Sequence, residues 1–258
     1  MTQMNHYILS LGLLAGMASD AAAAATIKGH EYLVIENDRS AYSFDKDTLS
    51  LVDIHDKLQD ISYIHEPSDE IFSIAVSTPD KETNGANTAG LITASSSKKR
   101  RYSFLDDGAT KRLTLYFDDC DDAAAGRELK VTVGVSLRGN EPHATWTIAM
   151  TSSEPVLLGE TRFPIISGIG TSVDNDHAKE YFAVPYYGGT MVENPRARVI
   201  CGEGWNNYPG GGMSVQLLTY CDGIGKGSLF LASLDTEDYR KTFSGEPRPS
   251  GESFNWYV

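Results

Sequence analysis

The sequence is short of basic charge, and this shortage argues against two classes of partner. Its 258 residues include 22 Lys and Arg against 35 Asp and Glu, which gives a net charge of −13. Nucleic acids and anionic membranes attract basic protein surfaces, so we expect neither to be a partner of this chain. The apolar fraction of 41% can still support a sizeable core, and the chain is therefore predicted to fold.

Cysteine is also scarce, with three residues in the whole chain: Cys120, Cys201 and Cys221. An odd number leaves at least one of them without a partner in the same chain. If the strand that ends at Cys201 folds back onto a strand that begins near Met213, Cys221 lies roughly 27 Å from Cys201, far beyond the reach of a disulfide. We therefore expect no bond between these two residues, and we expect the cysteines to act as small buried hydrophobes.

Motifs for metals, nucleotides and nucleophilic catalysis are missing. The six histidines are scattered, and no Cys-x-x-Cys, His-x-x-x-His or Gly-x-Ser-x-Gly spacing occurs. Four carboxylates surround Cys120 in residues 118–122, but they lack the alternating ligand positions and the glycine turn of a calcium loop. We expect no metal and no cofactor, and we expect residues 118–122 to form a solvated acidic turn.

The sequence has no apolar run long enough to span a bilayer. The longest candidate, residues 8–18, is too short, and it is followed by small residues that end in an alanine tract at Ala25. This pattern predicts a signal peptide over residues 1–25 and a secreted or periplasmic mature protein without a membrane span. A buried or frayed N-terminal helix is the alternative interpretation.

Alternation of apolar and polar residues is the dominant pattern after residue 25. It is clearest over residues 129–137 and 144–151, which are joined by a turn at 139–142. Such alternation is typical of antiparallel sheets with one face on a core, and it predicts roughly ten to fifteen short strands in two packed sheets. The expected fold class is an all-β, antiparallel β-sandwich that forms a single domain over residues 26–258. Residues 79–101, with a basic run at 98–101, are expected to form a solvated connection.

A glycine-rich aromatic loop over residues 203–213 carries the most specific chemistry of the chain. Two apolar runs follow it, at 214–220 and 227–235, and they are predicted to be strands joined by a turn. Aromatic rings can stack on the apolar face of a pyranose, while amides and carboxylates can bind its hydroxyls. The candidate ligand-binding residues are Glu203, Trp205, Asn206, Asn207, Tyr208, Gln216 and Asp235. Alternatively, Trp205 covers the core and the glycines only allow the turn.

Four segments, taken in order, resemble one family of sugar-related domains. They are Glu36–Asp53, Glu160–Pro164, Tyr208–Gln216 and Tyr220–Asp235. Together they are similar to the N-terminal galactose-mutarotase-like super-sandwich domain of large secreted glycoside hydrolases, in which a catalytic TIM barrel follows. The resemblance implies a super-sandwich, either complete or lacking a C-terminal part. The chain departs from this pattern at Leu234, where a histidine is expected, and it ends at Val258, before any barrel.

The resemblance implies a non-catalytic domain that binds carbohydrate or supports a catalytic barrel absent from this chain. The chain is then either a fragment or an accessory domain used alone. A stand-alone mutarotase-like enzyme or glycosidase is the alternative, and no catalytic residue can be assigned. A glycosidase needs two carboxylates that flank one bond, and five acidic residues fall near the loop: Glu203, Asp222, Asp235, Glu237 and Asp238. The candidate histidines for proton transfer, His143 and His177, lie in no motif.

Overall fold

The computed structural model describes residues 23–27, 30–79, 86–122, 127–170, 177–199, 207–209, 211–222, 227–235 and 240–258. These residues form strands and connecting segments, with two single-turn 3₁₀ helices, η1 (Ala94–Ser96) and η2 (His177–Lys179). Every strand pairing is antiparallel. The prediction of an all-β, antiparallel sandwich is therefore confirmed. No described helix is long and apolar enough to cross a membrane.

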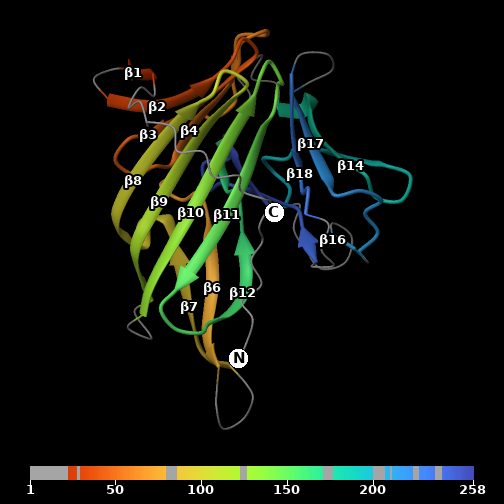
Figure 1. The fold of residues 1–258 in the computed structure, drawn as a ribbon. Helices are drawn as coiled ribbons and strands as arrows, with labels where there is room; N and C mark the ends of the chain where they lie inside the picture. Colours follow the sequence, from red (N-terminus) through yellow and green to blue (C-terminus); the bar gives the residue numbers. More distant parts are fainter. Residues whose placement is uncertain are drawn as a thin grey trace.

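The sheet with the longest strands, which we call the long sheet, contains four strands in the order β11-β10-β9-β8 (Figure 1). Their bounds are Ser97–Asp106 for β8, Thr110–Asp122 for β9, Arg127–Arg138 for β10 and Ala144–Ser152 for β11. The predicted hairpin of residues 129–151 is confirmed as β10 and β11, which pair from Leu129↔Ser152 to Leu137↔Ala144. The alternating apolar side chains of residues 129–137, including Val131, Val133 and Val135, are buried.

A second four-stranded sheet, which we call the groove sheet, lies to one side of the long sheet in Figure 1. Its order is β15-β14-β17-β18. The bounds are Glu180–Val184 for β14, Thr190–Glu193 for β15, Leu217–Asp222 for β17 and Ser228–Ala232 for β18. The two strands predicted from the apolar runs after the glycine-rich loop are thus confirmed as β17 and β18. A two-stranded ribbon, β16 (Asn207–Tyr208) with β19 (Lys241–Thr242), completes this part of the molecule.

The remaining strands form one five-stranded and two three-stranded sheets. The first is β1 (Ala23–Ile27), β2 (His30–Glu36), β3 (Ser40–Asp45), β4 (Leu51–Asp56) and β5 (Ile61–Ser62), in chain order. The second is β12 (Leu157–Arg162), β6 (Ser73–Pro79) and β7 (Ala86–Thr93). The third is β13 (Ile166–Ile169), β21 (Phe254–Tyr257) and β20 (Ser244–Pro247). The described residues therefore hold 21 strands, and the expected count of ten to fifteen was too low.

Strand β1 spans the predicted end of the signal peptide at residue 25, because its residues 23–27 pair with β2. Residues 1–22 lie outside the described part of the chain. The register runs without a shift from Ala23↔Val34 to Ile27↔His30. Whether these residues are removed during export stays a prediction of the sequence.

The basic run at residues 98–101 is part of a strand, which corrects the expected solvated connection over 79–101. Most of that segment forms β7, η1 and β8, and residues 80–85 lie outside the described part. The run belongs to β8, which is an edge strand, and charged residues are common on edges because they discourage pairing with other chains. Lys98, Lys99 and Arg101 are exposed, as expected, but on a regular strand.

The acidic run at residues 118–122 ends strand β9, and the prediction of an acidic turn there was wrong. A bulge absorbs the extra residue: the β9–β10 register shifts here, and Asp119 adopts a left-handed φ of 51°. The Asp119 carboxylate lies 2.7 Å from the Lys99 ammonium group. Because the basic and acidic runs lie on adjacent strands, each supplies the counter-charges of the other.

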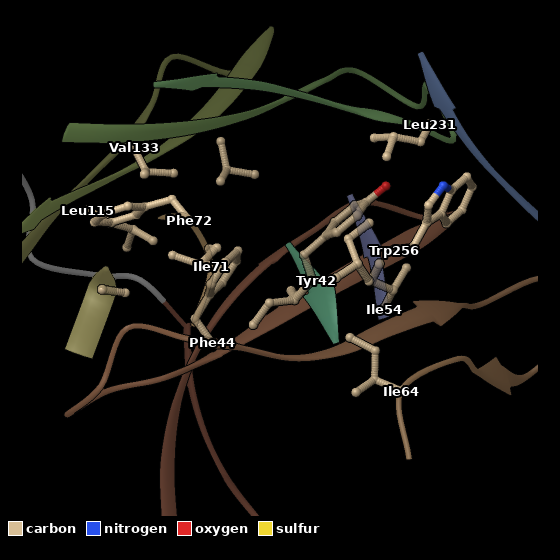
Figure 2. Packing of buried hydrophobic residues seen from close by; sticks show 14 of the residues in the cluster. Tyr42, Phe44, Ile54, Ile64, Ile71, Phe72, Leu115, Val133, Leu231 and Trp256 are labelled. Atoms are coloured by element: carbon tan, nitrogen blue, oxygen red, sulfur yellow. The ribbon is translucent and has the colours of Figure 1, made fainter. Parts of the chain in front are cut away.

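One continuous apolar core joins the five larger sheets. It contains buried side chains from each of them, among them Leu33, Ile74, Val133, Leu218 and Trp256. Figure 2 shows how Phe44 and Phe72 meet Leu115 and Val133 of the long sheet, while Leu231 and Trp256 pack at the other side of the cluster. The core therefore connects the long sheet with the groove sheet.

Candidate functional site

An open groove of about 720 Å³ lies on the outer face of the groove sheet. Its described lining consists of Tyr208, Ser214, Val215, Gln216, Leu217, Thr219, Phe230, Ala232 and Ser233. These residues come from β16, from the segment before β17, and from the facing strands β17 and β18. The groove is thus built almost wholly from the stretch that the sequence singled out.

The strand period explains why this face is available to a ligand. Along β17, Leu218 and Tyr220 are fully buried, whereas Leu217 and Thr219 alternate with them and lie on the other face. The register places Thr219 opposite Phe230, and Phe230 is 51% exposed. The inner face of the sheet therefore belongs to the core, and the outer face forms the groove.

The structure brings four of the seven predicted site residues together: Asn207, Tyr208, Gln216 and Asp235. Tyr208 and Gln216 line the groove. The Gln216 amide nitrogen donates a hydrogen bond of 3.2 Å to the main-chain carbonyl of Asp235, which joins the two walls behind the groove. The other three, Glu203, Trp205 and Asn206, lie outside the described residues.

Asn207 lies behind the groove surface. It is only 2% exposed, and its amide oxygen accepts a 2.6 Å hydrogen bond from the Thr242 hydroxyl. This bond crosses the β16–β19 ribbon at the pair Asn207↔Thr242. Asn207 therefore holds in place the strand that carries Tyr208.

A buried lysine ties the ribbon to the end of β18. The Lys241 ammonium nitrogen lies 3.1 Å from the Asp235 carboxylate, and the Lys241 side chain is only 8% exposed. Lys241 is the direct partner of Tyr208 in the ribbon. Lys241, Asp235 and Gln216 thus form a chain of contacts that sets the positions of Tyr208 and the opposite wall.

Sequence reasoning missed Phe230 and Lys241. The apolar run of β18 contains large hydrophobic residues at consecutive positions, Leu229, Phe230 and Leu231, so that both of its faces are apolar. This departure from alternation was the available signal for Phe230. Lys241 stands in no motif, so only the fold identifies it. His143, which had no assigned role, packs against Phe230 with ring centroids 5.9 Å apart.

A second cluster of charged groups lies on the inner face of the groove sheet. Glu180 and Asp222 are directly opposite each other on β14 and β17 and are 1% and 3% exposed. Arg196 binds Glu180 through two hydrogen bonds, of 2.8 Å from Nε and 2.5 Å from Nη2. Burial raises the pKa of the neighbouring Tyr220, and the carboxylates of Glu180 and Asp222 raise it further. A sugar cannot reach this carboxylate pair in the conformation described, so the pair fits a structural role.

A smaller polar cluster lies on β4 and β5. The Ser62 hydroxyl donates a 2.9 Å hydrogen bond to Asp53 and lies 3.2 Å from His55 Nδ1. Because the hydroxyl proton is directed to the carboxylate, His55 does not activate Ser62 as a nucleophile in this arrangement. Burial raises the pKa of Asp53, and the Ser62 hydrogen bond lowers it in part.

Metal and disulfide chemistry have few candidates in the part of the chain that the structure describes. There, no group of three or more His, Cys, Asp or Glu side chains is arranged to hold a metal ion. Cys120 is buried and free, and Cys221 is partly buried and free. Cys201 lies outside the described residues, and with it the expected distance to Cys221.

Comparison with known proteins adds no relative. No family model matches the sequence, and no curated protein matches it. The relation to galactose-mutarotase-like super-sandwich domains therefore stays a prediction from the four similar segments.

Proposed function

We propose that this chain is a non-catalytic, carbohydrate-binding β-sandwich domain of a secreted or periplasmic glycoside-hydrolase-like protein, and that it binds glycan in the groove. One observation carries the proposal. Two aromatic side chains, Tyr208 and Phe230, line the same open groove as the polar residues Gln216, Thr219 and Ser233.

The chemistry of a pyranose fits this lining. A sugar ring has an apolar face made of C–H groups and an equatorial rim of hydroxyls, so it needs aromatic and hydrogen-bonding groups side by side. A volume of about 720 Å³ falls within the range of small-ligand sites. An open groove also allows a chain to continue beyond the bound units, as a polysaccharide requires.

The proposal is tested by measuring glycan binding of the whole chain on a glycan array and then by calorimetry. We expect Tyr208→Ala and Phe230→Ala each to weaken binding about tenfold, which corresponds to the loss of one stacking contact of about 1.4 kcal/mol. Tyr116→Ala is the matched control, because Tyr116 is an outward-facing aromatic on the long sheet. Binding that survives the double substitution, or that Tyr116→Ala weakens equally, would contradict the groove as the site.

A second candidate function is docking of a protein domain such as a catalytic barrel. It is favoured by the amount of exposed apolar surface around the groove, where Tyr187 is 77% exposed, Leu234 76% and Met191 60%. One sugar ring does not cover so much apolar surface, and large exposed patches often mark interfaces. A reading frame that continues from this segment into a barrel would favour docking. In that case Met191→Asp should separate the two domains and leave glycan binding unchanged.

A further inference from the structure

The lack of charged residues in the described groove lining indicates which class of sugar the groove would bind. None of the nine described residues that line it carries a formal charge. We propose, on the basis of the proposed function, that the groove selects neutral glycans over glycans that carry carboxylate or sulfate groups. The selection follows from the absence of an available cation in this lining.

Lys241 is the cation that the fold brings to the back of the groove, and it is already neutralised. Its ammonium nitrogen lies 3.1 Å from the Asp235 carboxylate, and its side chain is 8% exposed. A sugar carboxylate would have to displace Asp235 from this contact in order to use the charge. Lys241 therefore positions Asp235 and Tyr208 and adds no free charge to the part of the lining that the structure describes.

His143 packs against Phe230, which lines the groove, and an acidic side chain lies beside it as well. Its Nε2 atom lies 3.5 Å from the Glu141 carboxylate. The Glu141 carboxylate therefore lies between this ring and any second anion that approaches its Nε2 atom. The two groups lie together in the connection between β10 and β11.

Burial of an anionic sugar in this groove would be costly. A carboxylate that leaves water without gaining a cation loses hydration that hydroxyl groups only partly replace. The chain also carries a net charge of −13, so its long-range field repels anions. A neutral ring meets neither cost, because its hydroxyls need only neutral partners such as the hydroxyl-bearing residues Ser214, Thr219 and Ser233 of the lining.

The test compares each glycan with its own anionic form. The strongest neutral ligand from the array is oxidised at its free C6 hydroxyls, which keeps the rings and linkages and replaces each of these CH2OH groups with a charged carboxylate. We expect the oxidised glycan to bind the whole chain at least tenfold more weakly. Equal or tighter binding of the oxidised form, or an array on which only uronic or sulfated glycans bind, overturns the neutral selection and leaves glycan binding standing. An array without any bound glycan overturns the proposed function itself.

Two variants test the cause of the selection. Asp235→Asn removes the carboxylate charge 3.1 Å from the Lys241 ammonium nitrogen, and we expect it to raise the affinity for the oxidised glycan several-fold at low salt. Glu193→Gln is its matched control, since it makes the same change in net charge on β15, two strands from β17. We expect the control to leave both affinities unchanged. An equal gain in Asp235→Asn and Glu193→Gln would mean that net charge, and not the lining, sets the preference.

Thr219→Lys provides an independent arm in case Asp235→Asn does not fold. It places a cation directly in the lining on a strand that is otherwise unchanged. We expect tighter binding of the oxidised glycan, and we expect this gain to disappear at about 0.5 M salt, where charges are screened within a few ångströms. No gain at low salt would contradict the role of the uncharged lining.

Discussion

The long sheet and the groove sheet are built alike on their inner faces and differ on their outer faces. On the outer face of the long sheet, one row of paired residues across the four strands consists of Ser103, Thr114, Gly134 and Thr147. On the outer face of the groove sheet, one row of paired residues consists of Met191, Ala183, Thr219 and Phe230. The first row is small and polar, as a surface in contact with water requires. The second ends in two large apolar side chains that are 60% and 51% exposed.

This difference shows where function is to be sought in an all-β chain. The inner faces of both sheets contribute to one core, so their apolar residues are explained by folding. The outer face of the long sheet is explained by solubility. The outer face of the groove sheet is explained by neither, and this is why we propose a ligand or partner that covers it.

The largest expected effect is a difference in stability between variants that break an ion pair in each of the two sheets. The Arg196–Glu180 pair of the groove sheet is buried, with side-chain exposures of 3% and 0%. Arg196→Met leaves a buried carboxylate without its partner, so we expect the free energy of unfolding to fall by about 3–5 kcal/mol. Urea denaturation measures the change.

The control for this prediction is Arg101→Met on the long sheet, where the Arg101–Asp118 pair is 60% and 19% exposed. Exposed pairs contribute about 0–1 kcal/mol, so this variant should unfold almost like the parent chain. Similar losses in the two variants would show that burial does not distinguish the two sheets as described.

A somewhat smaller difference in stability is expected between substitutions on the two faces of strand β18. Leu231 points into the core and is 9% exposed, so we expect Leu231→Ala to lower the free energy of unfolding by about 2–3 kcal/mol. Phe230→Ala removes a larger side chain, but one that is 51% exposed, and should cost less than about 1 kcal/mol. Thermal unfolding followed by circular dichroism compares the pair. A greater loss for Phe230→Ala would mean that Phe230 serves the fold and not the groove.

The smallest expected effect concerns the pH response of the long sheet. The Lys99 ammonium group, through its hydrogen bond and its charge, holds the pKa of Asp119 below its ordinary value. A lowered carboxyl pKa gives stability that is present above the pKa of the unfolded chain and is lost as pH falls through the pKa of the folded chain. Lys99→Met should therefore raise the Asp119 pKa towards its ordinary value. Carboxyl NMR titration measures this shift, and an unchanged pKa would show that Lys99 does not set it.

Alternation made much of the fold predictable. Leu113, Leu115 and Phe117 face inward because one face of a strand must be apolar to bury it, and this period is visible without coordinates. The charged runs were misassigned because charge was taken to mean a turn. A strand at an edge or a bulge tolerates charge when its neighbour supplies the opposite sign, as Lys99 does for Asp119. That neighbour is defined only by the pairing of β8 with β9.

The residues that line the candidate groove were predictable to the extent that they are local in the chain. Tyr208 and Gln216 were found because the glycine-rich loop and the strand after it hold unusual residue types within a short stretch. Phe230 and Lys241 were not, since their role depends on which face of β18 meets solvent and on which strand lies beside Tyr208. Neither relation is encoded by spacing along the chain.

By itself the sequence determined the secondary structure class and the inward faces of the strands, because the period of two and the burial of apolar side chains are local requirements. Only the tertiary structure decided that Tyr208 and Phe230 line one groove and that Lys241 is neutralised by Asp235 behind it. The physical reason is that strand pairing and sheet packing bring together residues that are distant in sequence. The chemistry of the groove arises from those contacts.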